Sequence, residues 1–146
     1  MIESIYIIIL IYILYISYNY VNNNIVNIKI NNINFYVRNI ENKEEAGEVL
    51  FKIREILINL VNKIYEDYTE NKLEIDEIKY MKYIKRIMNK IYTVKISENI
   101  KDSNLTSYTL NKGDEMVFCL RSKIDNSIHN LNDLVYVAIH EIAHIG

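Results

Sequence analysis

The chain has 146 residues and a formal net charge of −2 at pH 7; half of it is hydrophobic and a quarter is charged. This length supports one domain with its own core, and this composition excludes a largely disordered chain. The small net charge gives no indication of a basic surface that would bind nucleic acids broadly. Cys119 is the only cysteine, which excludes an internal disulfide and a thiolate zinc site.

Residues 1–21 form a hydrophobic segment. Ile5 to Ser17 is almost continuously apolar, and the run extends weakly through Tyr20 to Val21. A membrane-spanning helix needs about 20 apolar residues, with about 17 as the lower edge. We therefore expect a hydrophobic helix that anchors the chain in a membrane. Its orientation is unknown because no Lys or Arg lies close on either side. A buried strand or helix, or a signal sequence, is the alternative.

Residues 25–37 predict a small hairpin. Ile25–Ile30 and Phe35–Val37 are β-prone, and Asn31-Asn32 between them can form the turn because Asn tolerates left-handed backbone angles.

Two long amphipathic helices are expected next, from Glu41 to Tyr68 and from Leu73 to Tyr92. In both, apolar residues recur at helical spacing. The expected core positions are Ala46, Val49, Leu50, Ile53, Ile56, Leu57, Leu60, Val61 and Ile64 in the first helix, and Ile75, Ile78, Met81, Ile84, Ile87, Met88 and Ile91 in the second. The second helix also carries Lys79, Lys82, Arg86 and Lys90 on another face. A solvated face is a commoner explanation of such a pattern than a patch for an anionic partner, lipid or DNA.

A second hairpin is predicted beyond an irregular stretch from Val94 to Asn104. Ser107–Leu110 and Met116–Leu120 flank the turn residues Asn111-Lys112-Gly113-Asp114. Its free edge could pair with an extended peptide substrate. We expect Cys119 to be a small buried hydrophobe and Lys123–Asn130 to be a loop.

The last stretch contains His140-Glu141-Ile142-Ala143-His144, the H-E-x-x-H pattern of zinc hydrolases. On a helix, positions i and i+4 lie one above the other, so both imidazoles can bind one Zn²⁺ ion while Glu141 takes a proton from water. Asn132 or Asp133 can cap this helix, and its apolar face is expected to comprise Val135, Ala138, Ile139, Ile142 and Ile145.

A catalytic zinc normally has three protein ligands. His140 and His144 supply two, and the sequence does not identify the third. His129, Asp125 and a carboxylate of another chain are the alternatives; His129 is expected to be a polar loop residue instead.

Several blocks in order resemble the WLM-domain zinc metallopeptidases, in the form encoded by large DNA viruses. The blocks are Thr106–Gly113, Val117–Ser122, Leu131–Leu134 and Val137–Ile145, and the resemblance extends back to about Ile25. It implies a zincin-like α+β domain over residues 25–146 and zinc-dependent peptide hydrolysis. It also implies that His140 and His144 are metal ligands and that Glu141 is catalytic. The third ligand of that family is a histidine shortly after the motif helix, and this sequence has no position for it.

The sequence thus favours a membrane-anchored viral zinc metallopeptidase that acts on a peptide or protein and is incomplete at its C-terminus. The alternative is a truncated, catalytically inactive membrane-tethered module. A DNA-binding protein that uses the face from Lys79 to Lys90 is a third hypothesis, which strongly salt-dependent binding would support.

Overall fold

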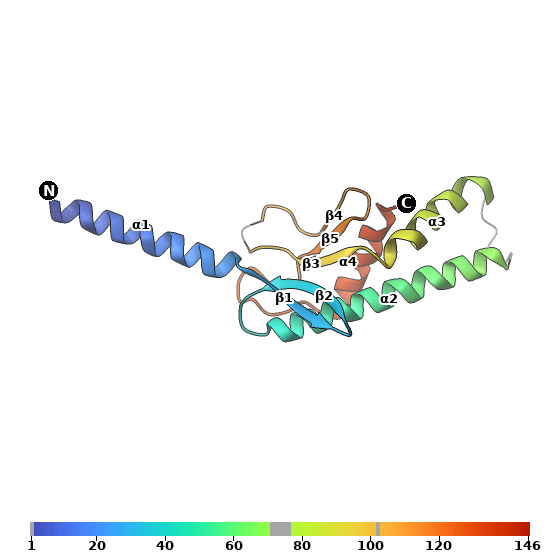
Figure 1. Cartoon of the computed structure of the whole chain (residues 1–146), viewed down its shortest axis with the longest axis horizontal. Coiled ribbons are helices and arrows are strands. Elements are labelled where there is room, and N and C mark those ends of the chain that lie inside the picture. The colour runs from blue at the N-terminus through green and yellow to red at the C-terminus, as the bar shows by residue number, and fades with distance from the viewer. Residues whose placement is uncertain (1, 71–76, 102) are drawn as a thin grey trace.

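Four helices and one five-stranded sheet make up the chain in the computed structural model, which describes residues 2–70, 77–101 and 103–146 (Figure 1). In chain order they are α1 (Ile2–Asn23), β1 (Ile25–Ile30), β2 (Ile33–Arg38), α2 (Lys43–Thr69), α3 (Glu77–Ile91), β3 (Lys95–Glu98), β4 (Tyr108–Leu110), β5 (Glu115–Phe118) and α4 (Leu131–Ala143). The expected α+β class is confirmed.

The sheet has the strand order β1-β2-β3-β5-β4. Both predicted hairpins are present as antiparallel pairs, β1 with β2 and β4 with β5. The first turn contains Asn31 and Asn32, whose φ angles of 47° and 64° lie in the left-handed region that Asn tolerates. β4 stands last in the strand order, so it forms one edge of the sheet.

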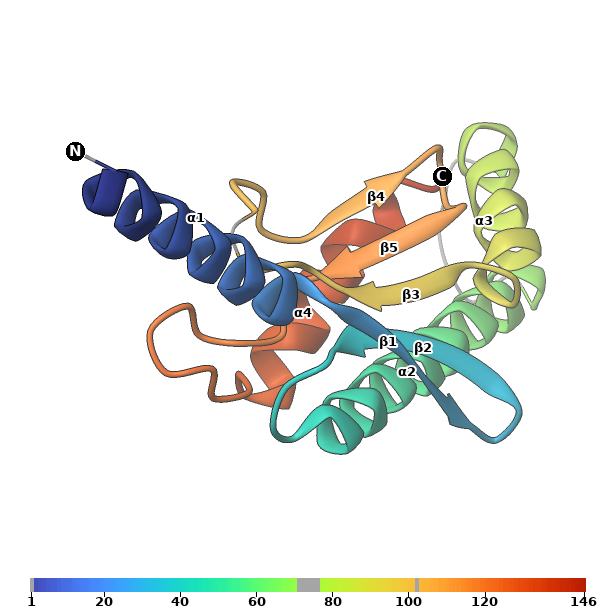
Figure 2. The ribbon, with the colours of Figure 1, turned by 60° about the vertical axis from the view of Figure 1, so that its left-hand side comes forward.

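β3 joins the two hairpins into one sheet because it pairs in parallel with β2 and with β5 (Figure 2). The expectation that Val94 to Asn104 is irregular was therefore wrong for Lys95–Glu98, which form β3. The strand is short, and only Ile96 supplies an apolar side chain to the core. Its polar residues are satisfied by partners distant in sequence, such as Glu115 for Ser97 and Arg121 for Glu98. A prediction from neighbouring residues cannot identify partners so distant in the sequence.

The hydrophobic core lies between the sheet and two helices. α2 packs against β1, β2 and β3, and α4 packs against α2, β4 and β5. The largest fully buried side chains come from both layers: Phe35, Val37, Leu50, Ile53, Leu57, Ile91, Ile96, Met116, Phe118, Leu120 and Ile145. The predicted periodicity of α2 holds at Ala46, Leu50, Ile53, Leu57 and Val61, whereas Ile56 is 37% exposed and Ile58 is buried instead.

α3 packs against α2, and it ends at Ile91, one residue before the predicted end. The expected start at Leu73 and the core position Ile75 lie outside the described residues. On the described part of the basic face, Arg86 Nη1 donates to the Gly146 carbonyl at 2.9 Å, and Lys90 Nζ pairs with Asp114 Oδ1 at 2.7 Å. These two cations are therefore engaged by this chain itself.

The hydrophobic N-terminal segment is helical, as expected. α1 projects from the rest of the chain (Figure 1), and its large side chains from Ile5 to Tyr20 are exposed. Over the residues that the structure describes, however, no helix combines the length and apolar character needed to cross a membrane. The uninterrupted apolar run ends at Ser17, and Asn19 follows. The expected membrane anchor therefore has no support from the described residues.

Candidate metal centre

The motif helix α4 begins at a side-chain cap. Asn130 accepts a hydrogen bond from the backbone N–H of Asn132 at 2.8 Å, so the cap lies two residues before the earlier of the two predicted positions. Such a cap satisfies one of the N–H groups that a helix start leaves without an intrahelical partner.

The buried face of α4 differs in part from the predicted one. Ala138, Ile142 and the following Ile145 are buried as expected, and Leu134 is buried in addition. Ile139 is 43% exposed, so its assignment to the apolar face was wrong. Ile139 lies next to His140 on the exposed side, whereas Leu134 is one helical turn from Ala138 and shares its face.

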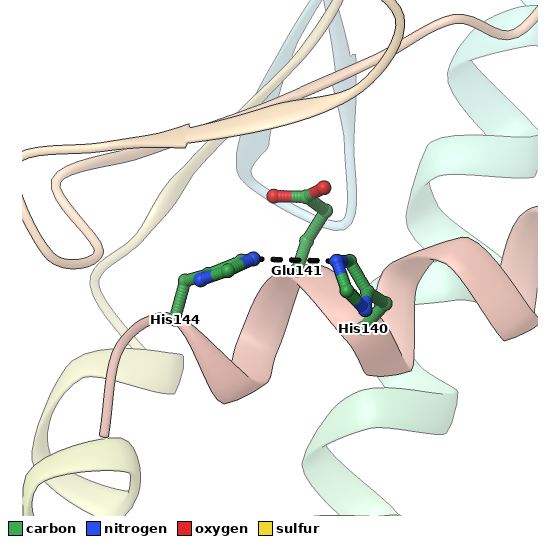
Figure 3. Close-up of side chains that lie close together, drawn as sticks. All are labelled: His140, Glu141 and His144. Carbon is green, nitrogen blue, oxygen red and sulfur yellow. Dashed lines mark hydrogen bonds between the residues drawn. The ribbon is translucent and has the colours of Figure 1, made fainter.

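His140 and His144 lie one turn apart, with their rings turned toward each other (Figure 3). Their Nε2 atoms are 3.3 Å apart, and the ring planes meet at 83°. Two nitrogens bound tetrahedrally at about 2.0–2.1 Å from a zinc ion lie about 3.3–3.4 Å from each other. The pair therefore has the separation that one tetrahedral metal ion requires.

Glu141 completes the cluster. One ligand atom from each of His140, Glu141 and His144 falls within 4.8 Å of the others. The two imidazoles are exposed, whereas the glutamate is only 6% exposed. Imidazole nitrogens are common zinc ligands, and a nearby carboxylate is suited to accept a proton. This donor set fits zinc, and it brings together all three of the predicted site residues.

Thr109 on β4 holds Glu141. Its Oγ1 lies 2.9 Å from the Glu141 carboxylate oxygen Oε2 and 3.0 Å from the Glu141 main-chain oxygen. The sequence analysis did not identify this residue. Thr109 belongs to a block that carries the family resemblance, but no spacing rule relates a strand residue to a helix residue 32 positions later.

A cavity of about 640 Å³ lies beside the cluster. His140 and Glu141 line one part of it, Leu134 and Val137 supply apolar surface, and Cys119 and His129 are also among the lining residues. Cys119 is only partly buried, so the expectation of a buried hydrophobe was wrong. Its position next to the edge strand β4 brings it to the cavity.

Neither of the two alternative ligands from the preceding loop belongs to the cluster. His129 reaches the cavity wall but is not among the three clustered groups. Asp125 is engaged locally: the Ser127 hydroxyl donates to it at 2.7 Å, and the Ser127 backbone N–H donates at 3.1 Å. Hydrogen bonds from the side chain of Ser127, and next from Ser122, lower the pKa of Asp125 to about 2.

The turn of the second hairpin contacts the end of the motif helix. Gly113 has a φ angle of +96°, and a Cβ atom placed on it would lie 3.0 Å from the side chain of Ile145. Ile145 is fully buried and directly follows His144. The hairpin thus contacts α4 at Thr109 and, at its turn, contacts Ile145 just beyond the end of α4.

The chain is 37% identical over 118 residues to an uncharacterised protein of Acanthamoeba polyphaga mimivirus. The match covers 80% of this chain but only 56% of the viral protein, so the chain spans about half of that protein's length. The similarity indicates a large-DNA-virus origin. No protein-family model and no solved structure matches the chain.

Proposed function

We propose that this chain is a zinc-dependent peptidase domain of the WLM type with a zincin-like fold. In this proposal His140 and His144 are zinc ligands and Glu141 is the general base. The observation that carries the proposal is the convergence of the two Nε2 atoms at 3.3 Å beside a buried carboxylate. The block resemblance from Thr106 to Ile145 and the similarity to a protein of a large DNA virus support the same class.

Zinc, when bound, makes water more acidic and polarises a scissile carbonyl. Glu141 takes a proton from the attacking water and delivers it to the leaving amine. Its burial and its hydrogen bond with Thr109 keep the carboxylate beside the two imidazoles throughout.

Two features suit a peptide substrate. β4 is an edge strand, and an edge strand can hydrogen-bond an extended peptide through its main chain. The neighbouring cavity, with Leu134 and Val137 in its wall, can accommodate an apolar side chain of that peptide. The peptide would then lie across His140 and Glu141, which also line this cavity.

The proposal requires a third zinc ligand. In the described part of the chain, His140, Glu141 and His144 form one cluster that could hold a metal ion. If Glu141 is the general base, only His140 and His144 remain as assigned zinc ligands. The incomplete ligand set favours a competing function, a non-catalytic module in which the site no longer acts on substrate.

Zinc affinity and hydrolysis separate the two functions. We expect His140→Ala and His144→Ala to lose one-to-one Zn²⁺ binding, measured by competition with a chromogenic chelator, and His129→Ala to retain it. We expect Glu141→Gln to keep zinc and to lose cleavage of a fluorogenic peptide library. Turnover retained in Glu141→Gln would refute the general-base role. Zinc bound only weakly by the unsubstituted chain, together with no cleavage, would favour the non-catalytic module.

A further inference from the structure

We propose that Thr109 is a positioning residue that fixes the orientation of Glu141. This inference rests on the proposed function, because it assigns the residue that orients the proposed general base. Among the described residues, Thr109 is the hydrogen-bond donor to the Glu141 carboxylate.

The hydroxyl of Thr109 reaches two different parts of Glu141. Its Oγ1 is 2.9 Å from Oε2 and 3.0 Å from the main-chain oxygen of the same residue. A hydroxyl has a single hydrogen to donate and two acceptor lone pairs. It can therefore donate to either oxygen without moving, and both the carboxylate and the helix backbone that bears it stay close to β4.

The sheet aims Thr109 at the helix. In the β4–β5 ladder, Thr109 lies opposite Met116, which is fully buried against the helices. Paired residues in a sheet share a face, so Thr109 also points toward α4, while Tyr108 and Leu110 point away. The orientation of the hydroxyl is thus set by strand register.

A fixed orientation of the Glu141 side chain would favour its role as general base. A glutamate side chain has three rotatable bonds, and a catalytic group must be held near one productive geometry. His140 and His144 are exposed, but Glu141 is only 6% exposed, so its carboxylate has little contact with solvent apart from the neighbouring cavity and needs a protein hydrogen-bond donor. Thr109 both satisfies the buried carboxylate and selects its position.

The test compares Thr109→Val, which has a similar shape without the hydroxyl, with Thr109→Ser, which keeps the hydroxyl. Thr69→Val is the control, because Thr69 donates to the Glu66 carbonyl on an exposed end of α2. The first readout is the rotamer population of Glu141 in the 146-residue chain, measured by NMR three-bond couplings. The second is the kinetics of peptide cleavage with Zn²⁺, and the third is zinc affinity.

We expect Thr109→Val to broaden the rotamer distribution of Glu141 and to lower kcat about tenfold or more, since hydrogen bonds to charged groups have effects of this size. KM and zinc affinity should stay near the unsubstituted values. Thr109→Ser should recover one rotamer and most of kcat, and Thr69→Val should match the unsubstituted chain. If Thr109→Val does not fold, Thr109→Ala replaces it.

A Glu141 rotamer distribution unchanged in Thr109→Val overturns the inference, as does an equal loss of kcat in the valine and serine variants. The rotamer readout does not depend on hydrolysis. If the unsubstituted chain cleaves no peptide, the proposed function fails while the role of Thr109 is still decided by the position of Glu141.

Discussion

Arg121 and Glu98 form an ion pair that is almost entirely withdrawn from solvent. Arg121 Nε lies 2.8 Å from Glu98 Oε1, and each side chain is 1% exposed. Glu98 also accepts the backbone N–H of Arg38 at 2.8 Å, and the guanidinium donates to the carbonyls of Glu41 and Asn42 just before α2. One charge pair therefore joins the end of β3, the start of α2 and the loop that leads to α4.

Removal of the Arg121 charge should destabilise the fold strongly. Arg121→Met leaves Glu98 buried without its cation, a change that typically costs about 3–5 kcal/mol. We expect a loss of this size in the free energy of unfolding from urea denaturation followed by circular dichroism. As a control, Lys63→Met removes an exposed cation paired with Asp67 and should leave the urea midpoint nearly unchanged. Similar midpoints for the two variants would contradict the importance of the buried pair.

Loss of the helix cap should weaken α4. Asn130→Ala removes the acceptor of the Asn132 N–H, and a lost cap of this kind costs about 1 kcal/mol. Asn132→Ala is the matched control, because the Asn132 backbone N–H remains. Amide hydrogen exchange should be faster in the first turn of α4 only in the Asn130 variant. Equal exchange in both variants would show that the cap contributes little.

Gly113 should not tolerate a side chain. At a φ angle of +96° an alanine is strained, and its Cβ would press on Ile145. We expect Gly113→Ala to lower the free energy of unfolding by more than about 1 kcal/mol. The neighbouring Lys112→Gly should have the opposite sign, because Lys112 has a φ angle of 54° that glycine adopts without strain. Thermal unfolding of the two variants compares them directly.

Asp125 should titrate far below an ordinary aspartate. Its pKa of about 2 is below the usual value of 3.8, so the carboxylate stabilises the folded loop above about pH 4. That contribution is lost as the pH falls from 3.8 through about 2. We expect Ser127→Ala to raise the pKa toward 3.8 and Ser127→Thr to keep it low, as measured by carboxyl ¹³C NMR. An unchanged pKa in Ser127→Ala would refute Ser127 as the main cause.

Much of the fold follows from local pattern. The spacing of Leu50, Ile53 and Leu57 predicted α2, because one helical face must be apolar to reach a core. Asn31-Asn32 and Asn111-Lys112-Gly113 predicted the two turns, because few residues adopt left-handed angles readily.

The helical spacing of His140 and His144 also predicted their approach, which the structure confirms at 3.3 Å between the Nε2 atoms. These features depend on residues close in the chain. The sequence could therefore predict the cluster on α4 without knowledge of the sheet.

The remaining features depend on partners far apart in the chain. β3 is stabilised by the ion pair between Glu98 and Arg121 and by the position of Ile96 in the core between the two hairpins. Both contacts involve residues far away in the sequence. The contact of Thr109 with Glu141 likewise requires the position of β4 relative to α4, which no local periodicity contains.

The pairing of Thr109 with Met116 makes the site sensitive to the second hairpin as a whole. A slip of β4 by one residue would send Thr109 to the opposite face and place Tyr108 or Leu110 over the motif helix. The turn at Asn111 to Gly113 fixes this alignment. Substitutions or length changes in the turn should therefore alter the position of the Glu141 carboxylate, although they lie far from it in the sequence. Random mutagenesis should therefore yield folded but misaligned variants at this turn, a class distinct from variants that lose a metal ligand.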